Sequence, residues 1–174
     1  TDYLTAAVLK RFGSEEAPAP SGEEALATIK QLLRYGPRYS GSEGRERAAE
    51  FLEAEMNALA DEVFIEKWTH HPAKGKEYDL ANIAARFYPE KEKRIVLGTH
   101  YDSKKFADKD KNNPAAPMPG ANDSASGVAV LVEIAKALAT ATAKPNVGVD
   151  VIFFDGEEGE ENASASTWRP LGSE

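Results

Sequence analysis

The sequence predicts an α/β protein with three layers, in which a mixed, mostly parallel sheet is covered by helices on both faces. Short apolar runs typical of strands alternate along the chain with longer segments in which apolar residues recur at helical spacing. Strands that alternate with helices usually pair in parallel and place the helices on both faces of the sheet. The length of 174 residues and the apolar fraction of 41% suit one domain with a sizeable core, and no internal repeat indicates a second.

The N-terminal part of the chain contains three segments with helical signals. Thr1 to Phe12 is expected to form a short helix, followed by a connection rich in Pro and Ala. Ser21, with Glu24 three residues later, forms a capping box that begins a second helix, which ends near Leu33. A third helix is expected from about Glu43 to Leu59, because its apolar residues share one helical face: Ala48, Phe51, Leu52, Met56 and Leu59.

Two strands are expected next, over Glu62 to Thr69 and Tyr78 to Phe87, where apolar residues alternate with polar ones or follow one another. A loop containing Lys-Gly-Lys joins them like the turn of a hairpin. His70 and His71 lie at the start of this loop and are expected at the surface rather than as metal ligands.

The remaining elements form a strand–helix–strand unit. Arg94 to Gly98 and Val149 to Phe154 are short apolar runs typical of buried strands. Ser124 to Ala139 lies between them and is strongly apolar over a length typical of a helix. Such a unit places the two strands side by side and in parallel.

Charge and composition exclude several classes of protein. The net charge of −8 argues against a nucleic-acid partner, which needs clustered Lys and Arg. No apolar run approaches the ~20 residues that span a membrane. The absence of cysteine excludes disulfides and thiolate zinc sites. The chain begins at Thr1 rather than Met, so any export signal would already be gone, and a secreted or periplasmic location is expected.

Residues with metal-binding chemistry follow the predicted strands in three blocks. His100 follows one strand, Glu157 and Glu158 follow another, and Asp123 immediately precedes the apolar helix. Because ligands in open α/β sheets bind beyond the carboxyl ends of the strands, we expect these side chains to share one crevice. Imidazole and carboxylate ligands without cysteine suit a catalytic zinc site, and a neighbouring Glu can act as the general base.

Each of these residues has a simpler explanation when it is considered alone. A single histidine such as His100 is most often a buried, hydrogen-bonded residue, and Asp123 is at a typical N-cap position. Adjacent acids such as Glu157 and Glu158 are usually solvated. The buried-type strand directly before these acids favours a function, since burial of unused carboxylates is costly. Asp102 is then expected to accept a hydrogen bond from the imidazole and to determine its tautomer.

From about Gly36 onward, the sequence resembles the zinc exopeptidase family that contains co-catalytic zinc aminopeptidases and glutaminyl cyclases. The resemblance depends on five motifs in the family's order, which are Tyr35-Gly-Pro-Arg-Tyr-Ser-Gly-Ser42, Leu80-Ala-Asn-Ile83, and the segments around His100, Asp123 and Glu157. It implies that residues 1–174 form a single catalytic domain of the zinc exopeptidase type.

The resemblance also implies roles for individual residues. Asp123 would bind or bridge zinc, Glu158 would be a zinc ligand, and Glu157 would be the general acid and base. His100 would bind a second zinc in an aminopeptidase, whereas cyclases retain this histidine without necessarily using it as a ligand. The peptide bond after Asp123 is often cis in this family.

Two branches of the family remain open, and the cyclase branch is favoured. The segment from His100 to Phe106, and the acids followed at a distance by Trp168, are similar to glutaminyl cyclases, in which a tryptophan lines the substrate pocket. This branch predicts one Zn²⁺ and an acyltransferase that converts N-terminal glutamine to pyroglutamate and releases ammonia. The segment Ser124 to Gly127 is similar to aminopeptidases, which are metallopeptidases with two Zn²⁺ that hydrolyse the first peptide bond. Both act on a peptide or protein with a free N-terminus, and a minor alternative is a degenerate binding domain without catalysis.

The last residues predict that part of the domain is missing. The chain ends at Leu171-Gly-Ser-Glu174 after a polar loop, without the helix that usually follows the latest strand of an α/β sheet. The family's pattern includes a further Asp and a His as ligands beyond this point. With Asp123, Glu158 and His100 as a partial set, the chain alone is expected to bind zinc weakly and to be inactive.

Overall fold

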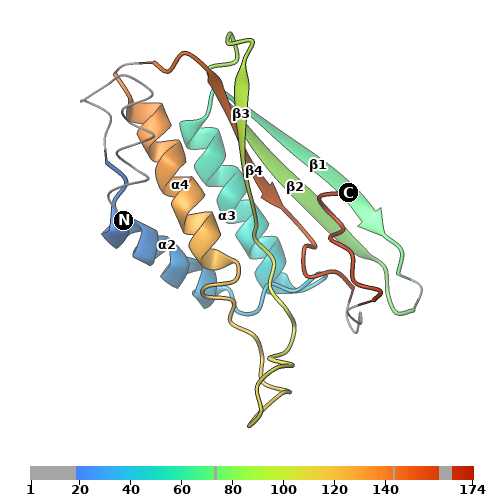
Figure 1. The fold of residues 1–174 in the computed structure, drawn as a ribbon. Helices are drawn as coiled ribbons and strands as arrows, with labels where there is room; N and C mark the ends of the chain where they lie inside the picture. The colour runs from blue at the N-terminus through green and yellow to red at the C-terminus, as the bar shows by residue number, and fades with distance from the viewer. Residues whose placement is uncertain (1–18, 73, 143, 161–165) are drawn as a thin grey trace.

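A four-stranded sheet packs on a group of helices in the computed structural model, which describes residues 19–72, 74–142, 144–160 and 166–174 (Figure 1). The described helices are α2 (Gly22–Arg34), α3 (Glu43–Leu59) and α4 (Ala125–Thr140), and the strands are β1 (Glu62–His70), β2 (Tyr78–Phe87), β3 (Arg94–His100) and β4 (Gly148–Phe154). The helix expected over residues 1–12 lies outside the described residues. Within the described ranges, none of the helices has the length and apolar character needed to span a membrane.

The strand order is β1-β2-β4-β3, and the sheet is mixed, as the sequence predicted. Only the β3–β4 pair is parallel, whereas β1–β2 and β2–β4 are antiparallel, so the prediction of a mostly parallel sheet is wrong for the described strands. The lengths of the connections between the strands explain this pairing. A short loop reverses the chain between β1 and β2, while a parallel pair needs a long crossover, which α4 provides only between β3 and β4.

All the described helices lie on one face of the sheet, although the sequence predicted helices on both (Figure 1). The other face exposes the side chains of Phe64 and Val96, which are 50% and 60% accessible. Strand β3 is at the edge of the described sheet, so it is more exposed than its apolar sequence predicted. Apolar sequence indicates the capacity for burial, but actual burial requires a neighbour on each side.

Local sequence signals account for where the helices begin. The Ser21 hydroxyl accepts the Glu24 backbone N–H at 3.2 Å at the start of α2. The Ser42 hydroxyl likewise accepts the Arg45 backbone N–H at 3.2 Å and donates to the Pro37 carbonyl at 3.1 Å. Each cap satisfies an N–H group that has no partner within its helix. The bounds of α3 are those that the sequence predicted.

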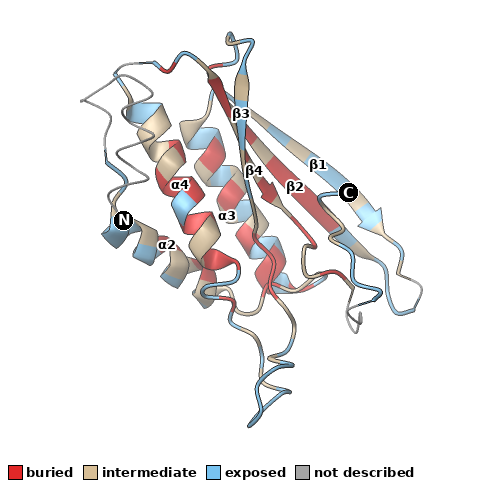
Figure 2. Cartoon of the chain, viewed as in Figure 1, coloured by how far each residue is buried: buried red, intermediate tan, exposed pale blue. Residues whose placement is uncertain are grey.

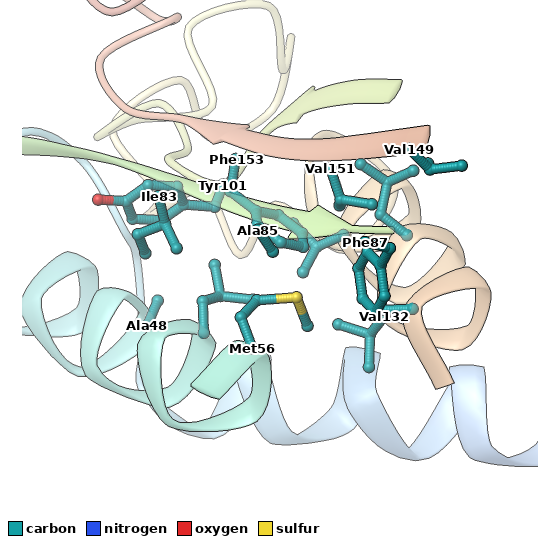
Figure 3. Packing of buried hydrophobic residues seen from close by; sticks show 14 of the residues in the cluster. Ala48, Met56, Ile83, Ala85, Phe87, Tyr101, Val132, Val149, Val151 and Phe153 are labelled. Carbon is teal, nitrogen blue, oxygen red and sulfur yellow. The ribbon is translucent and has the colours of Figure 1, made fainter. Parts of the chain in front are cut away.

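The core lies between the helices and the face of the sheet that they cover (Figure 2). Alternate residues of β2 and β4 point into it and contact the apolar face of α3 and one side of α4 (Figure 3). The side chains drawn there include Ala48, Met56, Ile83, Ala85, Phe87, Tyr101, Val132, Val149, Val151 and Phe153. This packing holds the carboxyl ends of β3 and β4 in fixed positions, and the predicted site residues lie at those ends.

Candidate metal centre at the carboxyl ends of β3 and β4

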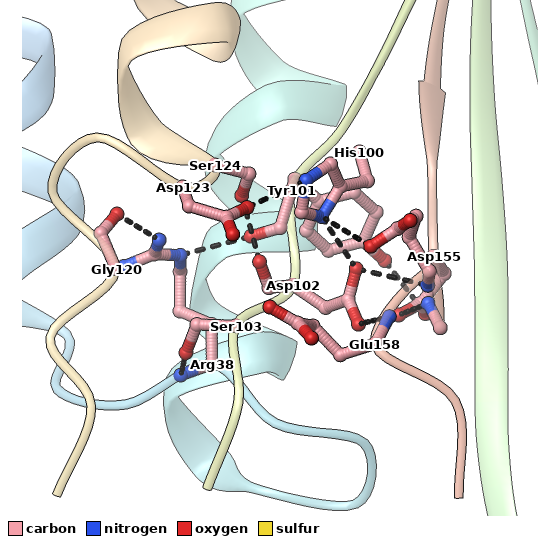
Figure 4. Close-up of polar contacts among 12 residues, drawn as sticks. Arg38, His100, Tyr101, Asp102, Ser103, Gly120, Asp123, Ser124, Asp155 and Glu158 are labelled. Carbon is pink, nitrogen blue, oxygen red and sulfur yellow. Dashed lines mark hydrogen bonds and ion pairs between the residues drawn. The ribbon is translucent and has the colours of Figure 1, made fainter. Parts of the chain in front are cut away.

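The parallel pairing of β3 with β4 brings the predicted site residues to one edge of the sheet. His100 ends β3 and is paired in register with Phe154, which ends β4. The turn after β4 therefore begins beside His100, and the loop before α4 brings Asp123 to the same place (Figure 4). Side chains from three separate segments thus meet at the carboxyl ends of these strands, where the sequence predicted a ligand site.

His100 lies between two carboxylates. Its Nδ1 is 3.2 Å from Oδ1 of Asp102, and its Nε2 is 2.9 Å from Oδ1 of Asp123 (Figure 4). Burial opposes protonation of the imidazole, but the hydrogen bond to Asp102 and the charges of Asp102, Glu157 and Asp123 outweigh it, so the pKa of His100 is raised. A nitrogen and a carboxylate oxygen this close must share either a proton or a cation.

Asp102 does more than orient the histidine, which was its predicted role. Its carboxylate is fully buried and also accepts the backbone N–H groups of Glu157 at 3.1 Å and Glu158 at 3.0 Å. Three donors thus converge on two oxygens. The Asp102 carboxylate connects the imidazole of His100 directly to the turn that carries both glutamates.

Asp123 is not the N-cap of α4, so the simpler explanation for this residue is wrong. The N-cap is Ser124, whose side chain makes no capping hydrogen bond and donates instead to the Asp102 carbonyl at 2.7 Å. The Asp123 side chain is turned toward His100 and is 68% accessible. The Asp123–Ser124 peptide bond is cis, as the resemblance implied.

Glu157 and Glu158 are partly buried rather than fully solvated. Burial, followed by the charges of Asp123 and Asp102, raises the pKa of Glu158 to about 7. Burial also raises the pKa of Glu157, whose Oε2 lies 3.8 Å from Nδ1 of His100. Figure 4 shows the Glu158 side chain extending toward the side of the site on which Asp123 lies. The carboxyl group of Glu158 can therefore exchange a proton near neutral pH, and the pKa of Glu157 is shifted in the same direction.

Trp168 lies beside the same turn. Its indole N–H donates to the Glu157 carbonyl at 2.9 Å, and the ring packs against Gly159, where an added Cβ would lie 3.1 Å from it. The indole remains 43% accessible. The hydrogen bond holds Trp168 next to Glu157, and its predicted role in lining a substrate pocket stays a prediction.

Several polar residues that support the site have no role in the sequence-based prediction. Asp155 is buried and accepts the Ala81 backbone N–H and the Tyr101 hydroxyl, both at 2.8 Å. Arg45 Nε lies 3.4 Å from its Oδ2, an ion-pair contact without hydrogen-bond geometry. Burial raises the pKa of Asp155 to about 6, against the opposing charge of Arg45. The sequence signal that could have identified this supporting residue is the position of Asp155, an acid directly after two phenylalanines.

The two other histidines differ from each other. His71 is exposed, as expected, and is 2.8 Å from Glu77. His70 ends β1 and is only 17% accessible, because its ring contacts Tyr78 and its Nε2 lies 2.8 Å from Oε1 of Glu160. The expectation that His70 is a surface residue is therefore wrong.

In the ranges that the structure covers, no three His, Asp or Glu side chains are arranged to hold one metal ion. The structure brings the side chains of His100 and Asp123 into contact. The Glu158 side chain contacts neither of them, but its backbone N–H binds the Asp102 carboxylate, and the charge of Asp123 contributes to its raised pKa. The chemistry of this donor set suits zinc, which accepts imidazole nitrogen and carboxylate oxygen.

Comparison with known proteins supports the same assignment. The profile described as "Peptidase family M28" matches residues 82–173, more than half of the chain, and this region contains every predicted site residue. The chain belongs to peptidase family M28. The predicted membership of the zinc exopeptidase family is thereby confirmed.

Proteins similar to this chain carry both of the predicted activities in their names. A glutaminyl-peptide cyclotransferase-like protein from Bos taurus is 32% identical over 128 residues, which cover 70% of this chain and 32% of the relative. The crystal structure of a glutaminyl cyclase from Tannerella forsythia superposes with a TM-score of 0.77 at 33% identity, over 90% of this chain and 55% of the other. A leucine aminopeptidase precursor from Bacteroides thetaiotaomicron superposes with a TM-score of 0.78 at 29% identity, over 91% and 56%. The chain thus spans about a third of that relative and just over half of these structures.

Proposed function

We propose that the protein containing this chain is a zinc-dependent glutaminyl-peptide cyclotransferase, which acts on peptides or proteins that begin with glutamine. One observation carries the proposal: Asp102 connects His100, which is paired with Asp123, to the turn that carries Glu157 and Glu158. Side chains that can bind a metal ion and carboxyl groups with raised pKa values thereby lie together at one edge of the sheet. The similarity to glutaminyl cyclases in the same family supports this choice.

Asp123, Glu158 and His100 would hold zinc, with one ion in a cyclase and two in an aminopeptidase. When bound, zinc would supply a Lewis acid that polarises the γ-carbonyl of the N-terminal glutamine. The turn after β4 would keep Glu158 in place, because the Asp102 carboxylate accepts the Glu158 backbone N–H. Outer groups of this kind orient ligands and strengthen metal binding.

Glu157 would transfer the protons of the reaction. The α-amino nitrogen of the substrate attacks the γ-carbonyl carbon, and the bond from that carbon to the departing nitrogen breaks. Glu157 would accept the proton from the amine and deliver a proton to the leaving ammonia. Burial raises the pKa of Glu157, which makes its carboxylate a stronger base than that of a solvated glutamate. Trp168, held at the Glu157 carbonyl, would line the substrate pocket.

An aminopeptidase is the second candidate. The contact between His100 Nε2 and Asp123 favours it, because a histidine and a carboxylate at this separation suit a second zinc. The similarity to the leucine aminopeptidase precursor also supports it. In this case Glu157 would deprotonate a water molecule for attack on the first peptide bond.

One experiment separates these functions. The zinc-loaded protein is incubated with a short peptide that begins with glutamine, and the products are identified by mass spectrometry. Loss of ammonia from an otherwise intact peptide is expected and establishes the cyclase. Release of free glutamine would establish the aminopeptidase. No product, with leucine- and alanine-terminated peptides also intact, would leave a binding domain without catalysis.

The role of Glu157 gives a direct prediction. Glu157→Gln should lower turnover by about 10²- to 10⁴-fold, because the amide cannot accept the proton. Zinc content should stay unchanged, since Glu157 is not proposed as a ligand. Glu160→Gln is the matched control, because Glu160 lies in the same segment but pairs with His70. Near-normal turnover in Glu157→Gln would exclude this role.

Two further expectations, on zinc affinity and on location, belong to the proposal. The chain alone should bind zinc weakly, because, of the three proposed ligands, the described structure brings only the side chains of His100 and Asp123 into direct contact. A tightly held equivalent of zinc in the purified chain would contradict this. A secreted or periplasmic location is a further prediction, which cell fractionation of the source organism would check.

A further inference from the structure

The motif from Tyr35 to Ser42 runs alongside the site, and its arginine is completely buried. The three guanidinium nitrogens of Arg38 each donate to a backbone carbonyl, and Figure 4 shows the contacts with Tyr101 and Gly120. Nε donates to Tyr101 at 2.9 Å, Nη1 to Pro119 at 3.0 Å and Nη2 to Gly120 at 2.8 Å. Within the described ranges, Arg38 forms no ion pair with a carboxylate at salt-bridge distance.

The backbone of Arg38 is also held at the site. Its N–H donates to the Ser103 hydroxyl at 2.9 Å, and its carbonyl accepts the Ser103 N–H at 3.2 Å. Ser103 directly follows Asp102. The arginine is therefore fastened to the segment after β3 through both its backbone and its side chain.

The carbonyls that Arg38 binds belong to the two segments that carry His100 and Asp123. Tyr101 directly follows His100, and Gly120 lies three residues before Asp123. The Gly120 carbonyl also accepts the Ala125 N–H at 3.1 Å. Gly120 has a φ of 65°, and a Cβ there would lie 2.7 Å from Nη2 of Arg38, so this close approach requires glycine.

Burial of a guanidinium group without a paired carboxylate is costly, and an apolar residue would fill the same space at lower cost. Burial accordingly lowers the pKa of Arg38, while the charges of Asp102 and Asp123 raise it. Packing alone does not explain a charged group here. The planar guanidinium can reach three carbonyls at fixed angles, which no other side chain can do.

We propose that Arg38 is a positioning residue, which sets the separation of His100 and Asp123 by binding the carbonyls of the two segments that carry them. This inference rests on the proposed function, because the separation matters only if the two residues share a metal ion. Arg38 touches neither substrate nor metal in this account. It acts through the backbone of Tyr101 and Gly120.

The test is Arg38→Lys, which keeps the charge but has one nitrogen in place of three. Zinc affinity of the protein, measured by competition with a chelator, should fall about 10- to 100-fold, as for other groups that orient metal ligands. At saturating zinc, kcat for the glutamine peptide should fall while KM changes little.

Arg94→Lys is the matched control. Arg94 also donates to backbone carbonyls, those of Phe87, Tyr88 and Val149, but at the opposite end of β3. Its substitution should lower the melting temperature without changing zinc affinity. A loss of zinc affinity in Arg38→Lys that is no greater than in Arg94→Lys would overturn the proposal.

A metal-free measurement separates this proposal from the proposed function. The imidazole ¹⁵N and ¹H signals of His100 in the zinc-free protein report its contacts with Asp102 and Asp123. They should shift or broaden in Arg38→Lys and stay unchanged in Arg94→Lys. If the protein lacks turnover but these signals respond, the proposed function fails and the positioning role stands. Unchanged signals in Arg38→Lys would overturn the positioning role.

A second variant applies if Arg38→Lys does not fold. Ser103→Ala keeps the guanidinium but removes the acceptor of the Arg38 N–H. The loss of one hydrogen bond should weaken zinc binding about threefold and move the His100 signals in the same direction. A Ser103→Ala protein with normal zinc affinity and normal His100 signals would overturn the proposal.

Discussion

The two ends of β4 each have an aspartate, and their surroundings differ. Near the amino end, Asp150 accepts hydrogen bonds from Arg94 at 2.7 and 2.8 Å and from Arg86 at 3.1 Å. The hydrogen bond from Arg94 is the main reason why the pKa of Asp150 is lowered. Directly after the carboxyl end, Asp155 is buried, its pKa is raised to about 6, and Arg45 approaches it without hydrogen-bond geometry.

This difference separates an end of the sheet with paired charges from the end that carries the candidate site. At the amino end, two guanidinium groups balance one partly exposed carboxylate. At the carboxyl end, acidic side chains outnumber basic ones: the acids are Asp102, Asp123, Asp155, Glu157 and Glu158. Crowded carboxylates destabilise a fold, but they favour the binding of a cation and supply groups that exchange protons near neutral pH. Local violations of good charge pairing are expected at functional sites.

The largest expected effect concerns the pH dependence of stability at Asp155. Its pKa is 3.8 ordinarily and about 6 in the folded protein, so the folded state binds more protons than the unfolded state between these values. This residue's contribution to the free energy of unfolding therefore falls as the pH rises from about 4 to about 6, by about 3 kcal/mol in total. In Asp155→Asn this component is lost. Urea denaturation across that range would measure it, and parallel curves for the two proteins would contradict the assignment.

The second effect concerns zinc binding at Asp102. Asp102→Asn leaves one oxygen for three N–H donors and directs an amide NH₂ group at one of them. Zinc affinity of the protein should fall about 10- to 100-fold. Asp150→Asn is the control, because it makes the same chemical change at the other end of the sheet and should leave zinc affinity unchanged. Equal zinc affinities of Asp102→Asn and Asp150→Asn would contradict the proposed difference between the two ends of the sheet.

The smallest effect is expected in the stability of Asp150→Asn itself. The loss of charge-assisted hydrogen bonds should lower the free energy of unfolding by about 1.5 kcal/mol at neutral pH, a value reduced by partial exposure of the group. Because the pKa of Asp150 is lowered on folding, this stability is present above pH ~4 and is lost as the pH falls through the folded value. Thermal unfolding at several pH values would show a trend opposite in sign to that of Asp155. The same sign for both would contradict the comparison.

Local sequence signals determined most of the elements and where the predicted site residues lie relative to them. The bounds of α3 follow from a serine cap and apolar spacing, both of which operate within a few residues. The positions of His100, Glu157 and Glu158 at strand ends were predictable, because parallel strands joined by a helix end at the same edge of a sheet. Asp123 was predictable as the residue before the helix between those strands.

Only the tertiary structure decided how these residues are held. The antiparallel pairing of β4 with β2, the exposed face of the sheet, and the contacts of Arg38 and Asp102 depend on segments that lie far apart in the sequence. Arg38 binds Tyr101 and Gly120 across 63 and 82 residues, and Asp102 binds the turn at Glu157 across 55. Periodicity and capping report on neighbours along the chain. Buried hydrogen bonds between distant loops arise only when the packed core brings those loops together.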